Sequence, residues 1–137
     1  MTWIPKKNYL ILIASISILF ISCQDYRIEN ATSDISRNWL LIKYELNNGD
    51  STIWYSTMIT NHTLSFTAEG TYTESYNYFG TPVSAGGFYN FQDNATQLVL
   101  SDEDTTFVFK IVDLTPHKLT IELINSYDDD VFYYEPY

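Results

Sequence analysis

Short segments in which apolar and polar residues alternate recur along most of the chain. Leu64, Phe66 and Ala68 alternate with threonine and serine, and similar alternation runs from Phe107 to Val112 and from Leu119 to Leu123. Because a period of two places one set of side chains on each face of a strand, these segments predict half-buried β-strands.

Turn signals separate the alternating segments. About nine short strands are expected, including one from Thr52 to Thr60, and no helical period is evident after Cys23. This spacing predicts an all-β, antiparallel fold, a barrel or sandwich built from hairpins. The turn signals are Asn47-Asn48-Gly49-Asp50, Glu69-Gly70, the breaker-rich loop from Gly80 to Gly87, Asp93-Asn94, Asp102-Glu103-Asp104, Thr115-Pro116-His117 and Asp128-Asp129-Asp130.

The order of several features is similar to that of a known group of proteins. These are Trp39, then Leu64-Ser65-Phe66 with Glu69-Gly70-Thr71-Tyr72, then Gly87-Phe88-Tyr89-Asn90-Phe91, and the run from Ile111 to Ile121. Together they resemble the lipocalin-like lipoproteins of Bacteroidota over about residues 37–137. The resemblance implies an up-and-down meander of about eight or nine strands that closes into a small barrel, and it implies no particular ligand.

The first 22 residues have the composition of a targeting segment. Lys6 and Lys7 precede an apolar run from Tyr9 to Ile21, and the segment contains no acidic residue. The run is shorter than the roughly 20 apolar residues that a membrane-spanning helix needs. It is also apolar on all sides, unlike an amphipathic core helix. The pattern predicts a signal peptide.

Cys23, the only cysteine of the chain, follows this run directly. Leu19-Phe20-Ile21-Ser22-Cys23 resembles the lipobox of bacterial lipoproteins, which implies that Cys23 is acylated and becomes the mature N-terminus. Two or three acyl chains anchor a protein stably. We therefore expect a signal peptide at 1–22, a lipidated N-terminus with a flexible tether at 23–36, and the barrel at 37–137. The expected location is the bacterial cell envelope, with anchoring at the outer membrane. The alternative is an ordinary secretory peptide followed by a chance cysteine.

Charge excludes some partners. Without residues 1–22 the chain has 17 acidic residues against five Lys and Arg, and the full chain already carries a formal charge of −10. Nucleic-acid binding needs clustered Lys and Arg to contact phosphate, so it is not expected. The expected partners are the membrane, through the lipid, and a small apolar ligand or an envelope protein.

Residues that could carry catalysis or metal binding form no known motif. His62 and His117 each lie beside a predicted turn, and the acidic runs lack the spacing of a calcium loop. Glu74 and Glu122 could form the carboxylate pair of a glycosidase, but we expect Glu74 on the solvent side of its strand. The sequence predicts neither an enzyme, nor a metal site, nor a cofactor.

Aromatic residues around the Gly80–Gly87 loop are the strongest functional signal. Small barrels can hold one apolar ligand in their mouth, and these rings suggest such a site. The interpretation that the composition favours over it is that they fill the interior or pair across strands. The candidate ligand-binding residues are Trp54, Tyr72, Tyr76, Tyr78 and Phe88. The first functional hypothesis is a non-enzymatic binding module. The alternatives are an accessory or inhibitor subunit of an envelope complex with a filled barrel, and, at lowest weight, an enzyme.

Overall fold

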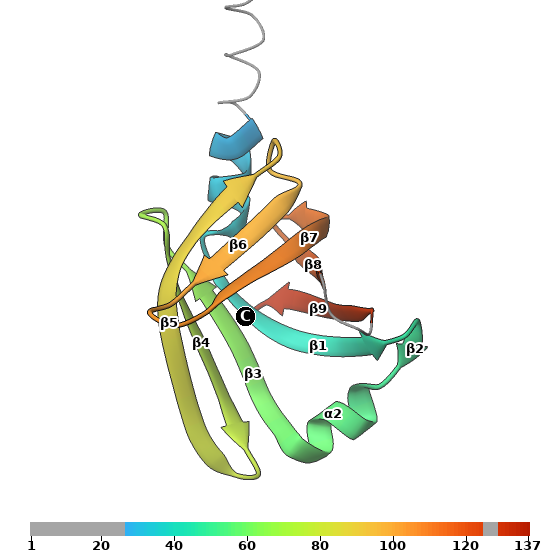
Figure 1. Ribbon diagram of the computed structural model, residues 1–137. Coiled ribbons are helices and arrows are strands. Elements are labelled where there is room, and N and C mark those ends of the chain that lie inside the picture. Colours follow the sequence, from blue (N-terminus) through green and yellow to red (C-terminus); the bar gives the residue numbers. More distant parts are fainter. Residues whose placement is uncertain (1–26, 125–128) are drawn as a thin grey trace, which may run out of the picture.

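Eight antiparallel strands close into a barrel in the computed structural model, which describes residues 27–124 and 129–137 (Figure 1). Hydrogen-bonded neighbours follow the chain order, and β1 pairs with β9 to close the sheet, while the short β2 pairs only with β1. This confirms the predicted all-β, up-and-down barrel. The elements are β1 (Asn38–Leu46), β2 (Gly49–Asp50), α2 (Thr52–Met58), β3 (Ile59–Phe66), β4 (Thr71–Tyr78), β5 (Thr81–Gln92), β6 (Gln97–Ser101), β7 (Thr106–Thr115), β8 (Lys118–Leu123) and β9 (Asp130–Pro136).

The inward-facing residues follow from the strand register. Tyr89 lies opposite Leu100, and Leu98 lies opposite Phe109, so all four share the inner face. Residues two apart along each strand continue that face, which is the pattern that the sequence alternation predicted. The buried apolar core comprises Ile35, Trp39, Leu64, Phe66, Tyr72, Tyr89, Leu98, Leu100, Leu119, Ile121 and Tyr134.

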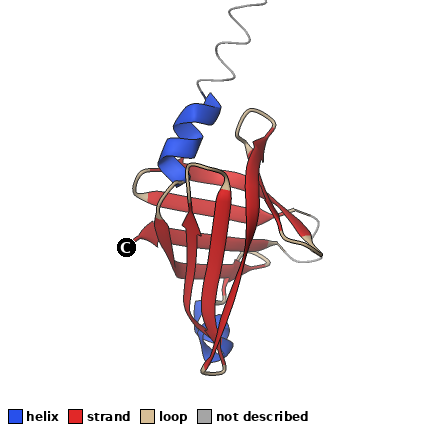
Figure 2. Ribbon diagram, turned by 90° about the vertical axis from the view of Figure 1, so that its left-hand side faces the viewer, coloured by secondary structure: helices blue, strands red, loops and turns tan. Residues whose placement is uncertain are grey.

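A helix over residues 27–35 covers one end of the barrel, opposite to the β4–β5 turn (Figure 2). Ile35 is completely buried and Ala31 nearly so, while Ile28 is 40% exposed. The indole Nε1 of Trp39 donates a 2.9 Å hydrogen bond to the carbonyl of Ile35, and the guanidinium of Arg37 lies over the Trp39 ring. The helix end is therefore joined to the barrel core by packing and by a buried hydrogen bond.

This helix differs from the flexible tether that the sequence predicted at 23–36. Ile28, Ala31 and Ile35 are spaced by three and four residues, so they make one apolar stripe of barely two turns. So short a stripe is hidden among the polar residues of the segment. Residues 23–26 of the predicted tether, including Cys23, lie outside the described residues, as does the predicted signal peptide.

The predicted strand at 52–60 is also wrong over most of its length, because Thr52–Met58 forms α2 and only Ile59 onwards is extended. Thr52 and its neighbours are β-branched or aromatic, which favours strands locally. Asp50 stabilises the start of the helix, because its carboxylate accepts hydrogen bonds from the backbone nitrogen (3.0 Å) and the hydroxyl (2.6 Å) of Thr52. The helix is held in place by Tyr55, whose ring lies 4.7 Å from that of Tyr44. Within the described part of the chain, no helix is long and apolar enough to cross a membrane.

The predicted loop from Gly80 to Gly87 is a strand. Only Phe79 and Gly80, both with positive φ, form the turn, and β5 starts at Thr81. A Cβ atom on Gly87 would lie 2.0 Å from the carbonyl oxygen of Ser101 and 3.1 Å from the ring of Tyr72. Gly87 thus permits the close approach of β5 to β6, a role that glycine has at bends of barrel strands.

Candidate functional site

A cavity of about 210 Å³ lies inside the barrel, on the side where the β6–β7 turn and the middle of β5 form its rim. We call it the cup. Its wall is mostly aromatic and aliphatic, with one imidazole and two carboxylates among the rings. The lining residues are His62, Leu64, Tyr72, Glu74, Ala85, Leu100, Asp102, Phe107, Phe109, Leu123, Phe132 and Tyr134.

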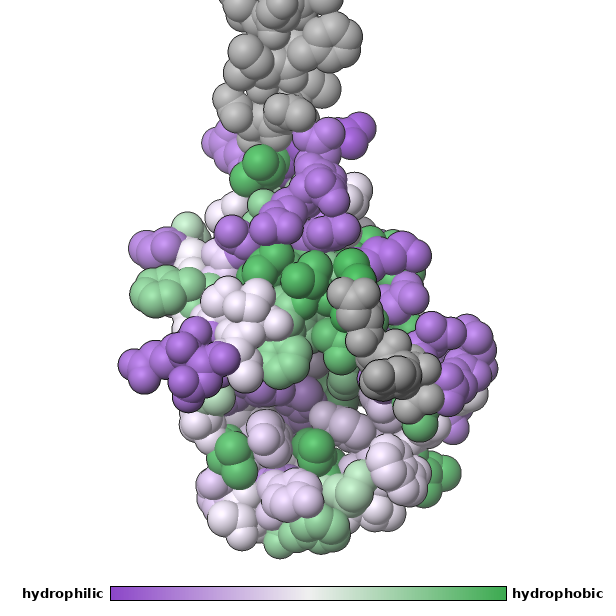
Figure 3. Space-filling view, viewed as in Figure 1, coloured by the Kyte–Doolittle hydropathy of each residue, from purple (hydrophilic) through white to green (hydrophobic). Residues whose placement is uncertain are grey.

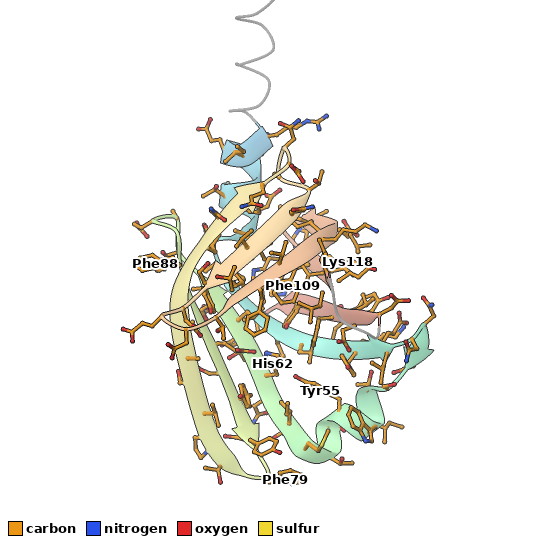
Figure 4. The ribbon with its side chains drawn as sticks, in the orientation of Figure 1. Tyr55, His62, Phe79, Phe88, Phe109 and Lys118 are labelled. Carbon is orange, nitrogen blue, oxygen red and sulfur yellow. The ribbon has the colours of Figure 1, made fainter. Side chains whose placement is uncertain are left out.

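A chain of three polar groups crosses from α2 to β4 at the cup. The hydroxyl of Tyr55 lies 2.8 Å from Nδ1 of His62, and Nε2 of the same ring lies 2.7 Å from Oε1 of Glu74. The second contact has the distance of an ion pair, but its angle is not that of an aligned hydrogen bond. Figure 4 shows Tyr55 and His62 facing one another below Phe109. These three residues are called the polar triad below.

Burial keeps the phenol of Tyr55 protonated. Burial, with a further contribution from Glu74, raises the pKa of Tyr55 far above its ordinary value of 10.0. The phenol can therefore donate its proton to Nδ1 of His62, whose side chain is only 6% exposed. In the tautomer that accepts this hydrogen bond the ring proton is on Nε2, on the side of Glu74.

Aromatic rings enclose His62 on several sides. The Tyr55 ring stacks at 6.1 Å, and the rings of Tyr76 and Tyr134 meet the imidazole edge-on at 5.7 and 5.9 Å. Tyr134 is completely buried, and burial raises its pKa well above the ordinary value. The imidazole is thus held in one orientation by rings as well as by its two polar contacts.

The five residues that the sequence predicted for ligand binding do not lie together. Tyr72 lines the cup, and Tyr76 contacts the His62 ring. By contrast, Trp54 on α2, Tyr78 at the end of β4 and Phe88 on β5 are exposed, and none of them lines the cup. Figure 4 shows Phe88 at the outer edge of the sheet.

The residues that the sequence analysis did not predict for ligand binding are the polar triad and four cup rings, Phe107, Phe109, Phe132 and Tyr134. The sequence analysis placed His62 beside a turn and Glu74 on the solvent side of its strand, but both line the cup. The alternation itself contained the signal: His62 precedes the inward-facing Leu64 by two positions, and Glu74 follows the inward-facing Tyr72 by two. The polar character of both residues concealed their place on the inner face.

The carboxylate pair considered for glycoside cleavage is not assembled. Glu122 lies on β8 and pairs with Lys110 at 3.3 Å, whereas Glu74 lies in the cup beside His62. His117 is exposed in the β7–β8 turn. Among residues 27–124 and 129–137, no group of three His, Cys, Asp or Glu side chains is close enough to hold a metal ion.

Comparison with known proteins supports the fold. No protein-family model matches the sequence, and no curated protein shows significant similarity to it. Among solved structures, the chain is similar to a lipocalin-like protein from Bacteroides uniformis, with a TM-score of 0.57 and 14% sequence identity. The match covers 76% of this chain and 99% of that one. At this identity the similarity establishes a lipocalin-like barrel and nothing further about activity.

Proposed function

We propose that this protein is a lipid-anchored envelope lipoprotein whose barrel binds a small ligand with an apolar body, without catalysing a reaction. The observation that carries the proposal is the cup, an aromatic cavity inside the barrel with a polar triad at one side. Ligand sites typically combine apolar walls with a few fixed polar groups. Barrels of about eight strands are just large enough to hold one small molecule.

The volume of the cup limits the size of the ligand. Pockets for drug-sized molecules have volumes of roughly 300–1,000 Å³, whereas the cup has about 210 Å³. An apolar cavity of about 150 Å³ is large enough for benzene. The proposed ligand is therefore a molecule, or the part of a molecule, of about one ring or a short chain.

Filling the cup tests this proposal. Ala85→Leu would place a larger side chain on its rim, whereas Ser84→Leu adds the same group at the neighbouring position, which faces outward. A thermal-shift screen of single-ring and short-chain compounds should give binders that the wild type and Ser84→Leu share and Ala85→Leu loses. A screen without any binder, or binders that Ala85→Leu keeps at full affinity, would contradict the proposal.

The anchor part of the proposal depends on Cys23 and on the short distance to the barrel. The helix that packs on the barrel is described from Arg27 onwards, four residues after Cys23. Four extended residues span at most about 14 Å, so an acylated Cys23 would hold the covered end of the barrel near the membrane. Labelled palmitate should enter the wild type and not Cys23→Ser, and the variant should leave the membrane fraction. Equal labelling of both proteins would refute the anchor.

A second candidate function, an accessory subunit of an envelope complex, is favoured by exposed apolar residues. Ile53 and Trp54 on α2 are 84% and 55% exposed, and Phe79 in the β4–β5 turn is 66% exposed. Figure 3 shows hydrophobic side chains at the lower end of the molecule, where these elements lie. Crosslinking in cells should then recover a partner that Trp54→Ser and Phe79→Ser lose. If the wild type recovers none, this candidate fails.

A further inference from the structure

Two carboxylates and one imidazole lie in the wall of the cup, beside the phenols of Tyr72 and Tyr134. Glu74 and Asp102 contribute carboxylates, and no Lys or Arg is among the lining residues of the described chain. The lysines of the described residues pair with acids elsewhere: Lys43 with Glu45, Lys110 with Glu122, and Lys118 with Asp113. The cup therefore has two anionic groups and no cationic side chain to neutralise them, apart from the imidazole.

Glu74 is held at the wall of the cup by one contact. Nε2 of His62 lies 2.7 Å from Oε1 of its carboxylate, and the opposite ring nitrogen, Nδ1, lies 2.8 Å from the hydroxyl of Tyr55. The Glu74 side chain is 33% exposed, so a molecule in the cup can reach it.

The two carboxylates also affect the pKa values of the tyrosines that line the cup. Burial is the main cause of the raised pKa of Tyr72, and the charges of Asp102 and Glu74 raise it further. Glu74 likewise adds to the effect of burial on the pKa of Tyr134. Neutral phenols are favoured where anions are close, and the same field favours a cation in the cavity.

Aromatic rings supply the second element of cation recognition. Tyr72, Phe107, Phe109, Phe132 and Tyr134 line the same cavity as the two carboxylates. The faces of such rings attract ammonium groups, with an effect that increases when water is excluded. Carboxylate and ring faces together suit an amine, whereas a ligand carboxylate would meet two like charges.

We infer that the cup binds a small organic cation, an amine or quaternary ammonium group joined to an apolar body. This inference rests on the proposed binding function and specifies its ligand class. The ammonium group lies toward Glu74 and Asp102, and the apolar body lies against the rings. The net charge of −10 on the chain adds a long-range attraction for such ligands.

Three probes of similar shape and different charge test the inference. Phenethylamine, 2-phenylethanol and 3-phenylpropionate share one ring on a short chain. Their affinities for the purified full-length chain can be measured by calorimetry or by chemical-shift titration at low salt. We expect the amine to bind about tenfold or more tightly than the alcohol, which is the usual gain for a hydrogen bond to a charged group. The carboxylate should bind most weakly.

Variants then assign the preference to the cup. Glu74→Gln keeps the shape and an acceptor for His62, and it should lower the affinity of the amine much more than that of the alcohol, so that most of the amine's advantage is lost. Asp102→Asn should give a smaller loss, because this side chain is exposed and its Oδ1 already accepts hydrogen bonds from Asp104 and Thr105 in the β6–β7 turn. Glu135→Gln removes the same charge from an exposed position of β9 outside the cup and should change nothing. Thermal unfolding of each variant, followed by circular dichroism, shows that it is folded.

The outcomes separate this inference from the proposed function. If the alcohol binds in the cup and the amine gains nothing, or if Glu74→Gln and Glu135→Gln behave alike, the cation inference is wrong and the binding function stands. Tighter binding of the carboxylate would have the same meaning. If none of the three probes binds, and the wider compound screen is also empty, both proposals fail.

Discussion

Truncation of Ile35 measures whether the helix of residues 27–35 is part of the folded barrel. The side chain is completely buried in the core. Ile35→Ala removes three carbon atoms, which at about 0.8 kcal/mol each costs about 2.4 kcal/mol in transfer free energy. The cavity that remains raises the expected loss of unfolding free energy to roughly 3–4 kcal/mol. At roughly 4 °C per kcal/mol for a domain of this size, Tm should fall by about 12–16 °C.

Ile28→Ala is the matched control, because it makes the same chemical change on the same helix at a side chain that is 40% exposed. Its expected effect is within about 0.5 kcal/mol. Urea unfolding followed by tryptophan fluorescence measures both variants, and Trp39, whose indole donates to the Ile35 carbonyl, is a natural reporter. Losses below about 1 kcal/mol for both variants would refute the packed helix and restore the flexible tether.

Three other perturbations test the barrel itself. Gly87→Ala should lower the free energy of unfolding by about 2 kcal/mol or more in a urea titration, because its Cβ would meet the Ser101 carbonyl oxygen at 2.0 Å. The control, Gly49→Ala, has its closest contact at 3.4 Å and should lose far less stability. Equal losses for the two variants would contradict the close approach of β5 to β6 at Gly87. Phe79→Gly should stabilise the chain by about 1 kcal/mol in thermal unfolding, since Phe79 has a φ of 46° and a ring that is mostly exposed. A loss of stability would show that the edge-on contact of this ring with Tyr78, at 4.8 Å between centroids, outweighs the backbone strain. Burial raises the pKa of Tyr134 above its ordinary 10.0, so the folded chain retains this proton more tightly than the unfolded chain. The free energy of unfolding should therefore fall as pH rises above about 10. Tyr134→Phe should reduce this fall between about pH 9 and about pH 11, and an unchanged slope would contradict the raised pKa of Tyr134.

The strands were predictable because their physical cause is local. Leu64 and Phe66 alternate with polar neighbours, and both are buried in β3. The Asn47–Asp50 turn was expected from its residues, although the positive φ angles belong to Asn47 and Asn48 and not to Gly49. Closure of the sheet by β1 and β9 depends on contacts between the two ends of the described domain. The alternation alone was compatible with a sandwich as well as a barrel, and only the resemblance to lipocalin-like proteins predicted the barrel.

The helices were missed because their stability comes from tertiary contacts. α2 consists mostly of residues with strand preference. Its position depends on contacts of Tyr55 with Tyr44 and His62, and no periodic pattern in the sequence indicates these contacts. Gly86 and Gly87 indicated a break in the chain, yet their role is close strand approach inside β5. Glycine has both uses, and only the neighbouring strand distinguishes them.

The site was hidden for a related reason. His62 and Glu74 occupy positions at which the alternation of β3 and β4 calls for apolar side chains. Buried polar pairs seldom stabilise a fold more than apolar residues of the same size would. Here polar residues replace apolar ones on two neighbouring strands, and Tyr55 of α2 supplies a polar partner for His62. Such local departures from the folding pattern are expected where function, and not stability, selects the residues. The binding function proposed for the cup accounts for these residues, since a carboxylate oriented by an imidazole and surrounded by rings can contact a ligand, whereas it adds little to the stability of an empty barrel.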